Sequence, residues 1–180
     1  AISRGPGAFT GVRLAIAIAQ GIALALDKPM VVMSTLQVIA ASVPPANAAE
    51  GKKQRILAAI DARMGEVYVG AFERNGDALL ALSNETVCAP QAVTLPDDLG
   101  GWHAVGTGFS AVDGALALHL GSQLTSIDAS VLPHAADVAR LAVAAYARGE
   151  AVAPERVEPA YLRNNVALTL EEQKALRASR

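Results

Sequence analysis

Apolar residues occur on every side of the first predicted helix of the chain. From Gly11 to Leu26 only Arg13 and Gln20 carry polar side chains. A helix on the surface of a globular protein normally has one apolar stripe, whereas a helix that is apolar all round is covered on both sides. We therefore expect the chain's own sheet to cover one side of this helix and a second molecule to cover the other.

The two sides of this helix can be separated by their helical spacing, because residues three and four positions apart share a face. We expect the side that contains Leu14, Ile18 and Ile22 to pack on the sheet of the chain. The opposite side is then the predicted partner-binding face. Its residues are Arg13, Ile16, Ala17, Gln20, Ala23 and Leu24.

The hydrophobic pattern after this helix predicts a short strand and a second helix. The apolar run over 30–33 is typical of a buried parallel strand, and Ser34 is a good N-cap for a helix over 35–42. The next stretch, 43–53, has two prolines and the composition of a linker. We place the domain boundary there. The predicted domains are residues 1–50 and residues 51–180.

The second predicted domain begins with a meander of three strands and continues with alternating strands and helices. Asn75-Gly76-Asp77 between the second and third strands is a good hairpin signal. Strand–helix alternation after a meander indicates parallel pairing and matches the order of a ribonuclease-H-like unit. The predicted strands are 55–61, 67–73, 78–82, 103–105 and 124–127, and the predicted helices are 109–120 and 134–148.

One arrangement occurs twice along the chain: a glycine turn, an apolar helix, a strand and another helix. The first copy opens at Gly5–Gly7 and the second at Gly106–Gly108. We interpret the two copies as a duplicated unit. The predicted fold class is α/β, with two ribonuclease-H-like units in the arrangement of actin and Hsp70. The first unit is expected to be incomplete at its N-terminus, because it lacks a meander of its own.

Composition excludes several classes of protein. The 180 residues are 52% hydrophobic and 18% charged, which is typical of a globular chain. A formal net charge of −2 argues against autonomous binding of nucleic acid, which usually needs a basic face. The longest apolar run is shorter than a membrane span, so no membrane association is expected. With Cys88 as the single cysteine there is no internal disulfide, and we expect a cytoplasmic protein.

The residues that could carry chemistry form two groups. Gly5, Gly7, Thr10 and Gly11 could cradle a phosphate at a helix N-terminus, because free backbone N–H groups attract anions there. The turn lacks the lysine of a P-loop and the G-x-G-x-x-G spacing, so we favour a purely structural turn with Thr10 as the cap of the helix. The three histidines lie far apart and outside any H-E-x-x-H pattern, so we predict no metal site and no catalytic residues.

The second group is Asp61, Arg63 and Glu66, at the bend between two predicted strands. Local ion pairs on an exposed turn would explain these residues, and each such pair contributes little to stability. A polar cluster that faces the cleft between two domains would explain them equally well. Both interpretations stay open from the residues alone.

Three segments resemble the signatures of the TsaB (YeaZ) family. Gly5–Arg13, GPGAFTGVR, resembles GPGSFTGVR, and Asp61–Tyr68, DARMGEVY, resembles DARRGEVY. Near the C-terminus, Pro159–Asn164 resembles the P-x-Y-L-R motif. Ala8 stands where serine is usual and Met64 where a second arginine is usual. The segments follow the family's order and extend over almost the whole chain.

The resemblance implies a non-catalytic scaffold or activating subunit, and not a protease. The complex it implies transfers threonylcarbamoyl from its adenylate to the adenosine next to the anticodon of tRNA. The implied partners are a TsaD-like catalytic subunit and a TsaE-like ATPase, which would hold ATP or ADP and a divalent metal. The chain itself would need no cofactor and would meet tRNA only through the complex.

Two alternatives stand beside this expectation. The same helix face could form a homodimer. The chain could also be an actin-like ATPase or phosphotransferase that acts through its own interdomain cleft.

Overall fold

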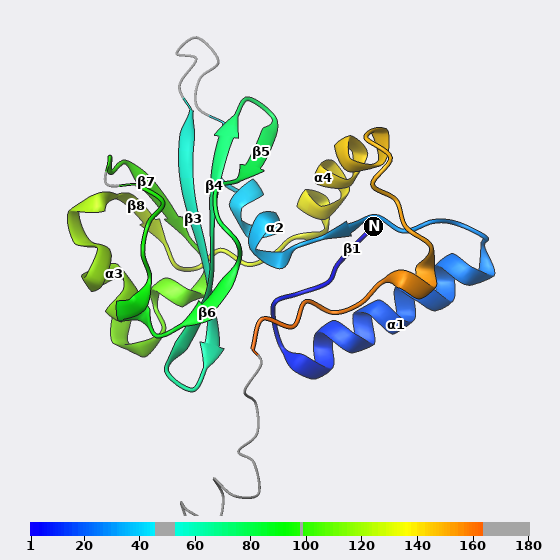
Figure 1. Cartoon of the computed structure of the whole chain (residues 1–180), viewed down its shortest axis with the longest axis horizontal. Helices are drawn as coiled ribbons and strands as arrows, with labels where there is room; N and C mark the ends of the chain where they lie inside the picture. The colour runs from blue at the N-terminus through cyan, green and yellow to red at the C-terminus, as the bar shows by residue number, and fades with distance from the viewer. Residues whose placement is uncertain (46–52, 98, 164–180) are drawn as a thin grey trace, which may run out of the picture.

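The computed structural model describes residues 1–45, 53–97 and 99–163 and shows a mixed α/β protein (Figure 1). A small parallel sheet pairs β1 (Ile2–Ser3) with β2 (Val32–Met33). A larger sheet has the order β5-β4-β3-β7-β8, and β6 also pairs with β4. Its strands are β3 (Gln54–Arg63), β4 (Glu66–Asn75), β5 (Ala78–Ala81), β6 (Thr86–Cys88), β7 (Trp102–Val105) and β8 (Leu124–Asp128).

Within the described residues, four α-helices accompany these strands, together with short 3-10 turns. The first helix lies against the small sheet, and the third covers one face of the larger sheet. One turn, Thr107–Phe109, follows β7, and another, Pro154–Arg156, lies beside the first helix. The helices are α1 (Phe9–Ala25), α2 (Thr35–Ala41), α3 (Ala115–Leu120) and α4 (Ala135–Ala147).

The larger sheet contains the predicted strands in the predicted order, and it adds β6, which was not predicted. β3 and β4 pair antiparallel, and so do β4 and β5, whereas β3 pairs parallel with β7 and β7 with β8. The parallel strands β7 and β8 thus lie beside β3, the first strand of the meander. This order is consistent with a ribonuclease-H-like unit. The small β1–β2 sheet does not by itself make a second unit, so the duplication stays a prediction.

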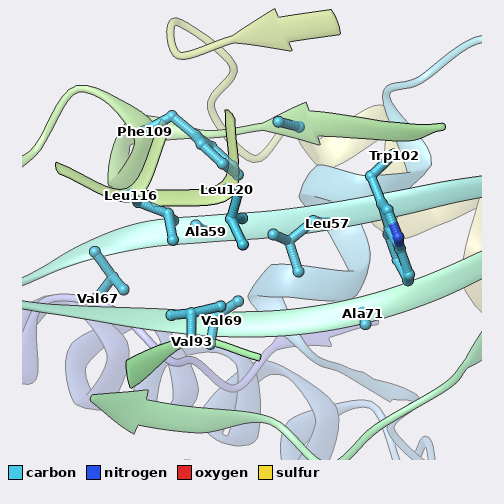
Figure 2. Close-up of a cluster of buried hydrophobic side chains, with 11 residues drawn as sticks. Leu57, Ala59, Val67, Val69, Ala71, Val93, Trp102, Phe109, Leu116 and Leu120 are labelled. Carbon is cyan, nitrogen blue, oxygen red and sulfur yellow. The ribbon is translucent and has the colours of Figure 1, made fainter. Parts of the chain in front are cut away.

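The core lies on both faces of β3, because its successive apolar side chains point to opposite sides. Leu57 faces Leu116 and Leu120 of α3, as Figure 2 shows. Ile56, on the other face, packs with Leu36 of α2. Ser34 caps α2 as predicted, since its side chain accepts hydrogen bonds from the backbone N–H groups of residues 36 and 37.

Two sequence predictions about helices need correction. The helix predicted over 109–120 is reduced to α3, because Val112 and Asp113 adopt positive φ values of 51° and 52°, which interrupt a helix. At the start of α1 the N-cap is Ala8, which offers no side-chain acceptor, and Thr10 lies inside the helix instead of capping it.

The C-terminal part of the described chain packs against its beginning. α4 contacts β2 and α2, and Val152 exchanges two 2.8 Å backbone hydrogen bonds with Met30. The segment 151–163, which we call the C-terminal strap, continues along α1 (Figure 1). The predicted division at residue 50 assigns these elements to the second domain, yet these contacts are with residues 1–50. Most of the predicted linker, 46–52, lies outside the described residues.

No helix in the described ranges combines the length and apolar character needed to cross a lipid bilayer.

The turn after β7 lies so close to β3 that only glycine fits. A Cβ atom at Gly108 would lie 2.6 Å from the Cβ of Ala59 and 2.8 Å from its carbonyl carbon. We expect Gly108→Ala to lower the free energy of unfolding by about 1–3 kcal/mol, as overpacking does. Urea denaturation would measure the change.

The matched control is Gly21→Ala on α1, where nothing lies within 4 Å of the added Cβ atom. It should raise the free energy of unfolding by about 0.5–1 kcal/mol, because alanine loses less backbone entropy in a helix. If both variants unfolded at the same urea concentration, the tight contact at Gly108 would have no energetic importance.

Candidate functional site

The candidate site is a cavity of about 710 Å³ between the N-terminus of α1, the β3–β4 turn and the turn after β7. Gly7 from the first signature segment lines it, and so do Asp61 and Arg63 from the second. The third segment contributes Arg163. Three motifs that are far apart in the sequence therefore meet at one place. Glu66 does not line the cavity but bonds to Arg163.

The β3–β4 turn has an unusual backbone. Arg63, Met64 and Gly65 have φ values of 63°, 57° and 76°. The Asp61 carboxylate holds the turn, because it accepts hydrogen bonds from the backbone N–H of Arg63 at 2.8 Å and from its guanidinium at 2.9 Å. This local ion pair lies at the rim, where solvent reduces its contribution to stability.

Arg163 joins the C-terminal strap to this turn. Its Nη2 donates to Glu66 Oε2 at 2.5 Å and to the carbonyl oxygen of Ala62 at 3.1 Å. Only 15% of the Arg163 side chain is exposed, so this charge-assisted bond is better shielded than the Asp61–Arg63 pair. Our sequence reasoning assigned Arg163 no role. The P-x-Y-L-R resemblance marked the segment but not the partner of its arginine.

The structure reverses the predicted orientation of α1. Ile16 and Ala23 are 4% and 8% exposed and pack with Met30 and Val157, whereas the expected inner residues point to solvent. Those residues, Leu14, Ile18 and Ile22, are 59%, 55% and 57% exposed. The prediction that this side of α1 packs on the sheet of the chain is therefore wrong.

The cause of this orientation is the C-terminal strap. The amide of Gln20 donates to the carbonyl oxygens of Pro154 at 2.8 Å and Val157 at 3.2 Å. The side of α1 that contains Gln20 and Ile16 is thus covered by the chain itself.

The other residues of the predicted partner face lie in different surroundings. The Arg13 guanidinium lies 3.2 Å from the ring centroid of Phe9 and 5.0 Å from that of Tyr161. It also donates to the Tyr161 hydroxyl at 2.7 Å. Ala17 and Leu24 are exposed. Of the six predicted residues, Ile16, Gln20 and Ala23 face inward, Arg13 bonds to the strap, and two face solvent.

The glycine turn before α1 has a structural partner. Gly5 is buried with a φ of 103°, and its carbonyl oxygen accepts a 2.8 Å hydrogen bond from the backbone N–H of Thr35. Positive φ at this position favours glycine. Thr10 and Gly11 lie exposed on the first turn of α1. Phosphate binding by these residues stays a prediction.

The described residues contain no group of three or more His, Cys, Asp or Glu side chains placed to hold a metal ion. Cys88 is half-buried, and burial raises the pKa of its thiol. A raised pKa leaves less of the reactive thiolate at neutral pH.

Comparison with known proteins gives the family. The family model described as TsaD, tRNA N6-adenosine threonylcarbamoyltransferase, matches residues 1–171. The tRNA threonylcarbamoyladenosine biosynthesis protein TsaB of Escherichia coli K12 is 43% identical over 175 residues, which cover 93% of this chain and 71% of that protein. The chain belongs to the TsaB family.

Further TsaB-family proteins agree in sequence and in fold. TsaB of Haemophilus influenzae is 34% identical over 174 residues, which cover 92% of this chain and 70% of that protein. A solved structure named YeaZ from Pseudomonas aeruginosa has a TM-score of 0.76 at 41% identity. A crystal structure from the same organism, described as similar to peptidase YEAZ, has a TM-score of 0.77 at 40% identity. Both structural matches cover 89% of this chain and 71% of the other.

The two arginines at the β3–β4 turn allow a matched test. Arg163→Met removes a shielded donor from Glu66 and Ala62, and should lower the free energy of unfolding by about 1–3 kcal/mol. Arg63→Met removes an ion pair whose arginine side chain is 86% exposed. It should change the free energy of unfolding by less than about 0.5 kcal/mol. Urea titration of both variants measures the difference, and equal effects would contradict a special role for Arg163.

Proposed function

We propose that this chain is a non-catalytic scaffold subunit in the biosynthesis of threonylcarbamoyladenosine on tRNA. The pathway comes from the names of its TsaB relatives. The scaffold role is supported by one observation above all, the apolar outer face of α1. On this proposal the chain acts by being bound, and the transfer of the threonylcarbamoyl group takes place on another subunit in the cytoplasm.

The outer face of α1 has the composition of a buried surface. Every exposed residue from Gly11 to Leu26 is glycine, alanine, leucine or isoleucine. Leu14, Ile18 and Ile22 are more than half exposed, and Leu24 is 60% exposed. A continuous apolar patch on a monomer marks a protein–protein contact. Gly11 and Gly21 lie on the same face, where their missing side chains would let a partner approach the helix closely.

We assign this face to a TsaD-like catalytic subunit. The TsaD family model matches residues 1–171, which supports a partner of the same architecture. A TsaE-like ATPase would complete the assembly, and ATP or ADP and a divalent metal would be held by these partner subunits. The tRNA would contact the complex and not this chain alone, in keeping with the net charge of −2.

The double substitution Ile18→Asp and Ile22→Asp tests the proposed docking face. Both side chains are exposed in the monomer, so the fold should persist. Two carboxylates buried in an apolar interface should abolish the complex, because an unpaired buried charge is costly. Size-exclusion chromatography and calorimetry with the cognate TsaD would measure the loss.

The matched control is Leu118→Asp on α3, which alters an apolar side chain that is 80% exposed and distant in sequence from α1. It should bind TsaD as the unaltered chain does. Undiminished binding by the α1 variant would place the interface elsewhere. Sedimentation of the chain without TsaD tests whether the same face forms a homodimer. Such a homodimer should dissociate in the same double variant.

The second candidate is an actin-like ATPase or phosphotransferase, favoured by the 710 Å³ cavity beside the uncapped N-terminus of α1. Calorimetry with Mg²⁺ and ATP separates the two functions. The scaffold proposal expects no saturable binding by the chain alone, and turnover without a partner would favour the enzyme.

A further inference from the structure

A second cavity, of about 600 Å³, lies beside the C-terminal end of α2. Its walls are the end of α2 with Val43–Pro45, the β4–β5 turn and one face of α4. Its volume is in the range of pockets that hold small molecules. None of the three signature segments contributes to it. It is therefore separate from the candidate site.

Arg74 of β4 lines this cavity and is only 7% exposed. Its Nη2 donates to the carbonyl oxygens of Ala40 and Ala41, at 3.3 Å and 2.9 Å. Its Nε is buried without an acceptor, and no carboxylate of the described residues lies within ion-pair distance of its guanidinium. A buried charge normally has a partner of opposite sign, so this one is exceptional.

The carboxylates nearby do not neutralise Arg74 directly. Asp137 of α4 is 5% exposed but pairs with Arg140 at 3.2 Å. Asp77, on the β4–β5 turn, is exposed to solvent. Burial lowers the pKa of Arg74, while Asp77 and Asp137 act in the opposite direction from a distance. Arginine is always protonated in proteins, so the guanidinium is a charge in a poorly hydrated place.

Capping of α2 explains only part of this arrangement. Arg74 Nη2 donates to two carbonyl oxygens at the C-terminal end of α2, where the last carbonyls lack partners within the helix, which is a structural role. That role accounts neither for the missing ion pair nor for the cavity beside the side chain. The remaining walls are mostly apolar, with Val43, Pro44 and Leu141 among them. The site combines one buried cation with a mostly hydrocarbon lining, which also includes Asp77, Asp137 and Arg140.

We propose that this cavity binds a small monocarboxylate with an apolar body. The carboxylate would accept hydrogen bonds from the Arg74 guanidinium, which recognises planar oxyanions well. The hydrocarbon part would lie along Val43 and Leu141. Binding would pair a buried charge that the described residues leave without an ion pair.

Sodium hexanoate, hexanamide and hexylamine are suitable probes, because they share a chain length and differ in charge. We expect hexanoate to shift the NMR resonance of the Arg74 Nε–H and to bind about tenfold more tightly than hexanamide, a difference of about 1.4 kcal/mol. Equal binding of hexanoate and hexanamide would overturn the proposal. So would tighter binding of hexylamine, which would make Asp77 and Asp137 the recognising groups.

Two substitutions locate the site. Arg74→Met should abolish the preference for hexanoate. Because it also removes the cap of α2, a second variant leaves Arg74 intact. Val143→Trp adds bulk at the mouth, where Val143 is 73% exposed, and should weaken hexanoate binding about tenfold. Leu118→Trp on α3 is the matched control and should bind normally. Unchanged binding by Val143→Trp would refute this location.

Discussion

The packing of the C-terminal strap against α1 decides which side of this helix is buried and which side faces solvent. Val157 packs with Ile16 and Ala23, and Gln20 bonds to two carbonyl oxygens of the strap. These bonds satisfy the amide of Gln20, the one uncharged polar side chain between Gly11 and Leu26. Once that side is buried, the opposite side must face outward. The proposed docking face is thus a consequence of an intramolecular contact.

The same strap links the two parts of the fold. Val152 bonds to Met30 near the small sheet, and Arg163 bonds to Glu66 on the larger sheet. Between them, Tyr161 meets Arg13 on the first turns of α1. The strap therefore brings the three signature segments around one cavity. This arrangement explains how motifs so far apart in the sequence can line a single cavity.

Local patterns predicted much of the topology. Alternation and a hairpin turn located the strands of the meander, and Ser34 marked the start of α2. The helix predicted over 109–120 was too long, because apolar spacing does not reveal that Val112 and Asp113 have positive φ. The site was predicted less completely. Asp61 and Arg63 line the cavity, but the partner of Glu66 lies 97 positions away in the sequence and has no local signal.

The sequence by itself determined that the first helix is apolar on both sides, because that property depends only on composition and helical spacing. It also determined the strand order, through the sequence of short elements and turns. Only the tertiary structure decided which side of α1 is inner and that Arg74 is buried without an ion pair among the described residues. Leu14 and Ile16 are equally apolar, so hydrophobicity cannot distinguish them. The choice depends on Pro154 and Val157, whose carbonyl oxygens reach Gln20 only when the chain is folded.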